Sequence, residues 1–509
     1  MPTGPRSRRK TAALYLLVTA IAVGALRRGG VEPPVAAGLT FAALAALALA
    51  WPRRPEAAAP AAPLWGRGLD GGLPLLALGL AAGAILVALQ LVPLPPALLR
   101  LLSPNAAGLF GETRAPVGRW PDWRPLSLAP GETALALLGA VGVAAAAAAA
   151  AFLGERRERV DALLRALAYT GLAASAFGMG AALFGFGPLL APNATFINPN
   201  HLAGFLQLAA WPAFGFALRA RGKERVGWLA VFALTVVGIF LSLSRGGITA
   251  FFVAAAVSSV LAVVHGHTPL TVALFARERR HEDRPLTRTV SPAEAGQGSP
   301  LTLTLSPGGG EGNVRGGGLS PGGGEGRRLL RSLALPVGVA SALGIAAWLA
   351  LEPVLTELET LSGAAAEVKP HLWPDGLRLV RQFPLTGIGR GAFATVYPSL
   401  KTESQQVTFT HLENTWLQLP VDVGVLQGLA LLALFAWAWL AAARQPDLSR
   451  PMIGALAGAA GVAAQNVVDF SFELAGVALP FAIVLGLASR AMPRVRVPRP
   501  LAMAAIALL

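Results

Sequence analysis

The residues of this chain that could do chemistry lie in a few short polar stretches between long apolar runs. Two of these stretches read NPNH at Asn198–His201 and SRGG at Ser244–Gly247. Arg245 stands beside two glycines, where the backbone can approach a ligand closely, and its planar fork suits a phosphate-like anion. The pattern predicts anion binding at Arg245. The candidate hydrogen-bonding groups beside it are Asn198, Asn200 and His201.

A second group of polar stretches adds candidate bases. They read KPHLWPDGLRLVR at 369–381, GIGRG at 387–391, THLEN at 410–414 and VDFSF at 468–472. Imidazole is suited to proton transfer near neutral pH, and a carboxylate can play the same part. His411 is therefore a candidate functional residue, and Glu413 is an ionisable neighbour of it. Further candidate ligands for the substrate are Lys369, Arg390 and Asn414.

Each of these residues also has a purely structural explanation. Asn198 and Asn414 both fit the N-cap of a following helix, and Pro199 then takes the first helical position. Arg245 could extend its side chain to lipid phosphates. The remaining alternatives are a solvated helix face for Lys369, Arg378 and Arg381, a surface position for His411, and a span end for Asp469.

The composition indicates which elements must position these residues. Of the 509 residues, 54% are hydrophobic and 14% are charged, whereas a soluble domain carries about 25% charged residues. A bilayer span needs about 20 mostly apolar residues, and many runs here reach that length. The net charge of +15 comes from short basic clusters between these runs. That pattern is typical of cytoplasmic loops and gives no reason to expect nucleic acid. The fold class is an all-α polytopic membrane protein.

Several chemistries are disfavoured by residue types alone. The chain has no cysteine, which excludes disulfides, thiolate metal sites and a cysteine nucleophile. It has six histidines and no H-E-x-x-H pattern, so we expect neither a metal nor another cofactor. The N-terminal MPTGPRSRRK and the apolar run after it resemble a signal peptide. No A-x-A site follows, and we expect a retained first span.

Apolar length and the Lys/Arg bias predict twelve spans, with NPNH, SRGG, GIGRG, THLEN and VDFSF all on the outer side. The spans are Thr11–Leu26, Pro34–Trp51, Leu73–Val92, Thr133–Leu153, Leu163–Phe186, His201–Leu218, Val226–Leu243, Ile248–Val264, Leu330–Leu351, Thr415–Ala442, Met452–Val468 and Ala475–Ser489. Helices distant in sequence would then bring polar ends to one face.

The spans divide the chain into seven segments. Spans one to four and the first outer loop make up residues 1–162, and spans five to eight make up residues 163–265. A cytoplasmic Gly/Pro-rich insertion follows at 266–328, then span nine at 329–351 and a large outer loop at 352–412. Spans ten to twelve make up residues 413–489, and a basic loop and apolar tail follow at 490–509. We expect the insertion to be disordered, because it cannot bury enough apolar surface to offset its ordering entropy. The tail is too short to cross, unless it begins a thirteenth span.

The order and sidedness of these motifs resemble the O-antigen ligase and O-antigen polymerase superfamily. The resemblance rests on FINPNHLAGFL, SLSRGG, PLTGIGRGAF followed by YP, and H-x-x-N-x-x-LQL followed by GVLQGL. The stretches LVPLPPALLRLLSP and WRPLSLAPGET are similar to the first outer loop of the family. The likeness extends from about Val92 to Leu487, apart from the insertion.

The resemblance implies a C-type glycosyltransferase fold and a metal-independent enzyme of the bacterial inner membrane with a periplasmic active face. Its donor would be a glycan on undecaprenyl pyrophosphate, and its acceptor would be a lipid or glycan hydroxyl. Membrane lipids would surround the protein. Arg245 matches an arginine expected to hold the pyrophosphate. Lys369, four residues before Trp373, stands where the family has an arginine. In the family, a histidine directly precedes the asparagine that matches Asn414. Here Glu413 directly precedes Asn414 and His411 lies two residues before Glu413, so either could be the base.

Two alternatives stay open beside a ligase. A polymerase of the same superfamily would join repeat units with the same residues. A transporter or a non-catalytic membrane protein is the third hypothesis. Transporters usually carry ionisable residues near the bilayer midplane, and the predicted spans carry almost none there.

Overall fold

The computed structural model describes residues 5–52, 73–112, 123–184, 195–267, 365–399, 409–489 and 492–495. Most of these residues are helical. The helices of the bundle are α1 (Pro5–Leu26), α2 (Pro33–Ala50), α3 (Leu75–Leu89), α6 (Pro130–Leu153), α7 (Arg157–Phe184), α8 (Pro199–Arg219), α9 (Gly222–Leu241), α10 (Arg245–Val264), α15 (Thr415–Val423), α16 (Val425–Ala443), α17 (Arg450–Gln465) and α18 (Ala475–Ala488).

Smaller elements join or cover these helices. They are η1 (Arg28–Gly30), α4 (Pro96–Leu102), α5 (Pro104–Glu112), α13 (Ala365–Gln382), α14 (Phe393–Val396), η4 (Tyr397–Ser399), η5 (Ser471–Glu473), β1 (Leu73–Pro74) and β2 (Arg494–Val495). The two strands pair antiparallel, with Leu73 opposite Val495.

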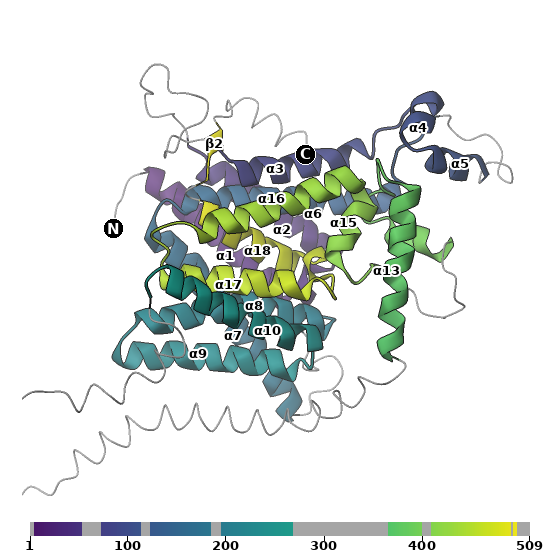
Figure 1. The fold of residues 1–509 in the computed structure, drawn as a ribbon. Coiled ribbons are helices and arrows are strands. Elements are labelled where there is room, and N and C mark those ends of the chain that lie inside the picture. Colours follow the sequence, from purple (N-terminus) through teal and green to yellow (C-terminus); the bar gives the residue numbers. More distant parts are fainter. Residues whose placement is uncertain are drawn as a thin grey trace, which may run out of the picture.

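Among the described residues, eight helices are long and apolar enough to cross a bilayer: α1, α2, α6, α7, α8, α9, α10 and α16. They lie side by side in one bundle (Figure 1). The apolar helices α3 and α18 are shorter. The fold is therefore that of a mostly helical, multi-pass membrane protein, as the composition predicted.

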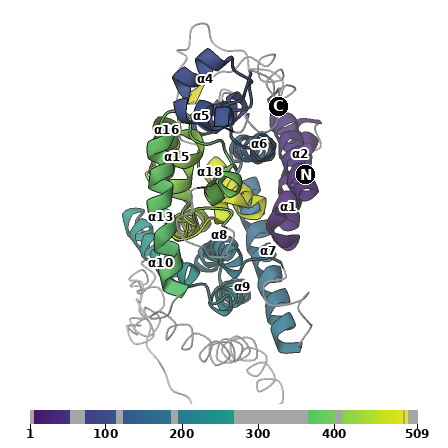
Figure 2. The ribbon, with the colours of Figure 1, turned by 90° about the vertical axis from the view of Figure 1, so that its right-hand side faces the viewer.

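Helix α8 forms the centre of the bundle. Of its most apolar stretch, 94% is buried, against 17% for α16 at the periphery, and the end-on view shows other helices around it (Figure 2). It packs tightly on α17 through glycines. A Cβ on Gly454 would meet the Trp211 carbonyl oxygen at 2.0 Å, and one on Gly458 would meet that of Gln207 at 2.5 Å. Small residues at such contacts let two apolar helices approach closely.

The predicted spans agree with the helices in most places, and one is wrong. The predicted tenth span is two helices, α15 and α16, which meet at Gly424. Gly424 has a φ of 93°, a left-handed conformation that an α-helix cannot continue through and that glycine adopts without strain. The predicted ninth span and the tail 501–509 lie outside the described residues. So does the insertion, apart from Gly266 and His267.

The large loop predicted between spans nine and ten is described from Ala365 to Ser399 and from Phe409. It forms a small cap with its own core, in which α13, α14 and the 409–414 segment pack on the α5 region. Helix α13 runs across one end of the bundle (Figures 1 and 2). The buried members of this core are Ala106, Ala129, Leu372, Leu379, Phe383, Ile388, Ala392, Phe393, Val396, Tyr397, Leu412 and Val421.

The end of the bundle beneath this cap is called the polar end here. Helices α8 and α10 begin there and α17 ends there, because Gln465 at the end of α17 donates to the carbonyl of Asn200 and the Cγ of Gln465 lies 3.5 Å from a Cβ built on Gly246. At the opposite end, Arg219 pairs with Asp161 at 2.8 Å. The helix ends that the sequence predicted on one side of the membrane thus lie together.

Candidate functional site

The NPNH stretch forms the first turn of α8 at the polar end. The Asn198 side chain accepts a hydrogen bond of 2.8 Å from the backbone N–H of Asn200, and Pro199 takes the first helical position. The capping role predicted for Asn198 is confirmed, since this bond satisfies an amide that the helix itself cannot. The cap directs the next residue, His201, into the bundle, where it is 5% exposed.

The SRGG stretch forms the first turn of α10 beside that of α8. Ser244 is the N-cap and accepts from the backbone N–H of Gly247 at 3.0 Å. The carbonyl of Gly247 accepts from Gln207 of α8 at 2.7 Å. A Cβ on Gly247 would lie 2.4 Å from that of Ala203, so only glycine allows this approach. Arg245 is thereby held, half-buried, at the junction of α8, α10 and α17.

The end of α17 closes this junction with a buried carboxylate. Gln465 donates both to the carbonyl oxygen of Asn200 at 2.6 Å and to Oδ2 of Asp469 at 2.9 Å. The other carboxylate oxygen, Oδ1, faces Nε2 of His201 at 3.5 Å, and the two side chains are 3% and 6% exposed. Asp469 thus lies just beyond the end of α17, as the span-end alternative expected, and it is also a buried partner of His201.

Phe470 brings the two histidines of the site together. The His201 ring meets the Phe470 ring edge-on with centroids 4.7 Å apart, and the His411 ring stacks on it at 4.6 Å. Burial lowers the pKa of His411 below its ordinary value, an effect that Glu473 opposes and that Arg390 and His201 reinforce. His411 is therefore neutral near neutral pH, the state that a general base needs.

Arg390 joins the cap to the bundle through two carboxylates. Its Nη1 donates to Oδ2 of Asp422 at 2.5 Å and its Nη2 to Oε2 of Glu473 at 2.6 Å. Burial alone would lower the pKa of Arg390, but these two carboxylates raise that pKa above its ordinary value. Burial likewise acts to raise the pKa of Glu473, but Arg390 and His411 bring it below its ordinary value. The trio is a paired, charged unit.

This pairing bears on the predicted role of Arg390 as a substrate ligand. Both arms of its fork are occupied, and its backbone is also tied down: the N–H donates to the side chain of Gln90, whose amide donates to the carbonyl of Asp422. We therefore interpret Arg390 as the residue that positions the glycine-rich 387–391 turn against α15. Direct contact with an anion would require it to leave a carboxylate.

The remaining predicted residues lie at the edge of this cluster. Asn414 caps α15 by accepting from the backbone N–H of Leu417 at 3.0 Å, which confirms its predicted capping role. Glu413 has a left-handed backbone, with a φ of 51°. The backbone of Lys369 belongs to α13, and its side chain lies outside the described part of the chain.

Three members of the site, Asp422, Asp469 and Glu473, were not predicted as functional. A signal for two of them was present in the sequence, because acidic residues within or directly after apolar runs are costly unless they are paired. Asp422 follows the apolar stretch TWLQLPV and is 0% exposed. The identities of their partners could not be read from the sequence, since each partner comes from another segment.

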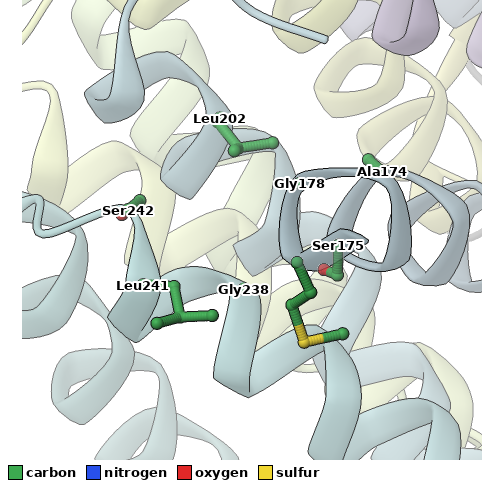
Figure 3. Close-up of a pocket in the computed structure, with 8 residues that line it drawn as sticks. Ala174, Ser175, Gly178, Leu202, Gly238, Leu241 and Ser242 are labelled. Atoms are coloured by element: carbon green, nitrogen blue, oxygen red, sulfur yellow. The ribbon is translucent and has the colours of Figure 1, made fainter. Parts of the chain in front are cut away.

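A small apolar pocket with a volume of about 50 Å³ lies one turn inside the polar end, between α7, α8 and α9 (Figure 3). Leu202, next to His201, and Ser242, three residues before Arg245, both line it. The Oγ of Ser175 is buried there and has no hydrogen-bond partner among the described residues. An apolar space thus borders the charged cluster directly.

The arrangement places a cationic fork, a neutral imidazole and a buried carboxylate–imidazole pair at one end of an apolar bundle. Within the described ranges, no three His, Cys, Asp or Glu side chains are arranged to hold a metal ion. No protein-family model matches the chain, and no curated protein matches it.

Proposed function

We propose that the protein transfers a glycan from a polyprenyl diphosphate carrier to an acceptor hydroxyl at the polar end of the bundle. The observation that carries this proposal is that Arg245 and neutral His411, 166 residues apart in sequence, both lie beside the 465–470 segment at the polar end: Gly246 packs near Gln465 and Val468, and His411 stacks on Phe470. The motif resemblance to the O-antigen ligase and polymerase superfamily supports undecaprenyl diphosphate as the carrier. It also supports a C-type glycosyltransferase fold and a periplasmic site on the inner membrane, and the apolar runs of the sequence support twelve spans.

The chemistry needs two groups of this kind. The acceptor oxygen attacks the anomeric carbon, and the bond from that carbon to the diphosphate oxygen breaks with its electron pair staying on the diphosphate. The Arg245 fork can bind the phosphate oxygens and stabilise the charge that develops on them. The acceptor proton passes to the imidazole of His411, or to Glu413, which stays the alternative base.

The lipid carrier is supported by the pocket beside the charged cluster. A polyisoprenoid chain needs apolar surroundings, while its diphosphate needs donors and cations. The pocket wall at Leu202 and Ser242 is continuous with the turns that carry His201 and Arg245. A short apolar part of the donor next to its diphosphate could therefore lie in this pocket while the diphosphate lies at the charged cluster.

Ligase and polymerase activity differ only in the acceptor. A ligase would attach one glycan to a lipid core, and a polymerase would extend a glycan and yield a ladder of repeat lengths. Both use the same donor site, so product analysis separates them. A transporter would move solute without breaking the bond between sugar and diphosphate.

The test is glycan transfer in proteoliposomes that contain a polyprenyl-diphosphate-linked glycan and candidate acceptors. We expect Arg245→Ala and His411→Ala each to lower the transfer rate by about 10²–10³-fold, the loss typical when one preorganised group that stabilises or relays charge is removed. Arg221→Ala, at an exposed position at the opposite end of α9, is the matched control and should keep the full rate. Full activity in both site variants would rule out this mechanism.

A further inference from the structure

The end of the bundle opposite the polar end is rich in basic residues and is called the basic end here. Helices α7 and α9 begin there and α8 ends there. Residues 155–165 and 219–225 together contain eight basic and four acidic side chains. Two of the four acids already pair with a lysine and an arginine, at 2.6 and 2.8 Å. This end therefore carries an excess of positive charge that an anion could balance.

Three aromatic rings stack at the basic end. Trp228 of α9 is buried, and the rings of Phe216 in α8 and Tyr169 in α7 stack on it, with centroids 4.6 and 5.1 Å away. Arg165, one turn earlier on α7, places its guanidinium carbon 5.3 and 5.9 Å from the centroids of Phe216 and Trp228. These are cation–π distances. The rings hold the Arg165 side chain against α8 and α9, but they supply neither a carboxylate nor a carbonyl acceptor.

Arg165 differs from its neighbour Arg219 in its ionic partners. The guanidinium carbon of Arg219 lies 5.0 Å from the centroid of Phe216, and Arg219 also pairs with Asp161 at 2.8 Å. Arg165 is exposed, and no described residue forms an ion pair or a hydrogen bond with its side chain. A guanidinium fork can bind two oxygens of one phosphate. Among the described residues of this cluster, Arg165 is therefore the cation that is available to a ligand.

The length of α7 places Arg165 at the border of the hydrocarbon. The helix has 28 residues and is about 42 Å long, whereas the hydrocarbon core is about 30 Å thick. Its first residues, RERVD, are mostly charged and its last turns are apolar, so the surplus of about 12 Å extends out of the core at the basic end. Arg165 lies eight residues after the start of α7, or about 12 Å along its axis. This is the level of lipid headgroups, where Trp and Tyr rings are also typical.

The exposed face of α7 continues from Arg165 into the hydrocarbon. The exposed residues along it follow at intervals of three or four: Arg165, Tyr169, Ala173 and Ala176. Residues with this spacing lie on the same face of a helix, and α7 lies at the edge of the bundle (Figure 2). A ligand along this face would meet a cation at the headgroup level and apolar surface below it. Phospholipids have the matching arrangement of phosphate and acyl chains.

We propose that this face of α7 binds an anionic phospholipid of the leaflet at the basic end, with its phosphate on Arg165 and its acyl chains along Tyr169 and Ala173. The occupant is a lipid, because the cation lies at the border of the hydrocarbon and its face continues as apolar surface. The lipid is anionic, because the basic side chains in excess at this end attract net negative charge. The inference is independent of the proposed function, since the glycan-transfer site lies at the other end of the bundle.

The first experiment is native mass spectrometry of the delipidated full chain in detergent, titrated with phosphatidylglycerol, phosphatidylcholine or glycerol 3-phosphate. We expect the wild type to bind phosphatidylglycerol more tightly than either other probe. Arg165→Ala should weaken this binding by about 10- to 100-fold, the effect of losing a hydrogen bond to a charged group. It should also remove the preference over phosphatidylcholine. Equal binding of the two lipids by the wild type would overturn the inference. Glycerol 3-phosphate that binds as tightly as phosphatidylglycerol would indicate a site for a soluble anion and would also overturn it.

Two variants separate a built site from diffuse attraction by charge. Arg221→Ala is the matched control, because Arg221 is exposed at the same end and has no cation–π contact with a described ring. It should weaken phosphatidylglycerol binding by at most about fivefold, the contribution of one basic residue near an anionic surface. Arg165→Lys keeps the charge but loses the fork, so its binding should fall between those of wild type and Arg165→Ala. Equal losses in Arg165→Ala and Arg221→Ala would leave only diffuse attraction and refute the site.

A quencher carried by the lipid tests the location on α7. The chain has no cysteine, so a fluorophore can be attached to Ala173→Cys, one turn beyond Tyr169 on the exposed face. In phosphatidylcholine liposomes, a small fraction of brominated phosphatidylglycerol should quench this fluorophore more strongly than the same fraction of brominated phosphatidylcholine. The difference should disappear when Arg165→Ala is added. If neither lipid quenches the fluorophore, another segment of the chain covers this face and the inference is wrong.

Discussion

Replacing Arg390 with methionine gives the most direct test of how the cap is held on the bundle. The guanidinium reaches two carboxylates at 2.5 and 2.6 Å, and the three side chains are 17%, 0% and 14% exposed for Arg390, Asp422 and Glu473. Arg390→Met leaves both carboxylates buried without their shared cation. Breaking a buried pair by removing one partner costs about 3–5 kcal/mol, and we expect a destabilisation of that size.

Three further variants separate charge from packing. Arg390→Lys keeps the charge but cannot bond both carboxylates with a fork, so its stability should fall between those of wild type and Arg390→Met. Combining Arg390→Met with Asp422→Asn and Glu473→Gln removes every charge of the trio and should recover most of the loss. Arg378→Ala breaks an ion pair whose arginine is 52% exposed, and it should cost at most about 1 kcal/mol.

The assay is equilibrium unfolding in detergent micelles, followed by tryptophan fluorescence as SDS is added. Trp373 of α13 packs on the core of the cap, and Trp416 of α15 donates to the carbonyl of Ala463 in α17, so the signal includes this region. Equal stability of Arg390→Met and Arg378→Ala would show that the buried trio contributes no more than a surface ion pair. A triple variant no more stable than Arg390→Met would show that the loss comes from packing.

Two further predictions concern the base and the sidedness of the site. Burial lowers the pKa of His411, and the neutral imidazole is the active form, so the transfer rate should be flat through neutral pH and fall only on the acid side, below the ordinary histidine pKa of about 6.5. The Glu413→Gln variant should show the same fall in rate at acid pH. If His411→Gln also shows an unchanged fall, another group is the base. Because the chain lacks cysteine, single cysteines can be introduced at the exposed positions Ile197 and Lys223 and labelled with a membrane-impermeant maleimide in intact cells whose outer membrane is permeabilised. Ile197→Cys should react with the maleimide, and Lys223→Cys should not. The reverse pattern would place the site on the cytoplasmic side.

Features that depend on local sequence could be predicted well. Apolar length located the spans that became α2, α6 and α8 to within a few residues, because a helix that crosses hydrocarbon must satisfy its own backbone hydrogen bonds over the whole thickness. The caps at Asn198 and Asn414 followed from residue type and position. The break at Gly424 could not be predicted in the same way, because the apolar run continues through it without a change in composition.

The contacts that define the site are of another kind. His201 and Asp469 are 268 positions apart, and Gln90 and Asp422 are 332 apart. No local pattern specifies which carboxylate meets which cation over such separations. Arg245 and Arg390 look equivalent as arginines beside glycines, yet the structure pairs Arg390 with two carboxylates and leaves it a positioning role.

The amino-acid sequence by itself determined that this chain is a helical membrane protein and that its polar stretches lie at the same ends of their helices. Both properties follow from the cost of placing charge and unpaired backbone groups in hydrocarbon, which acts on each segment separately. Only the tertiary structure decided which of those polar groups neutralise one another, because that depends on distances of a few ångströms between helix ends brought together by packing around α8.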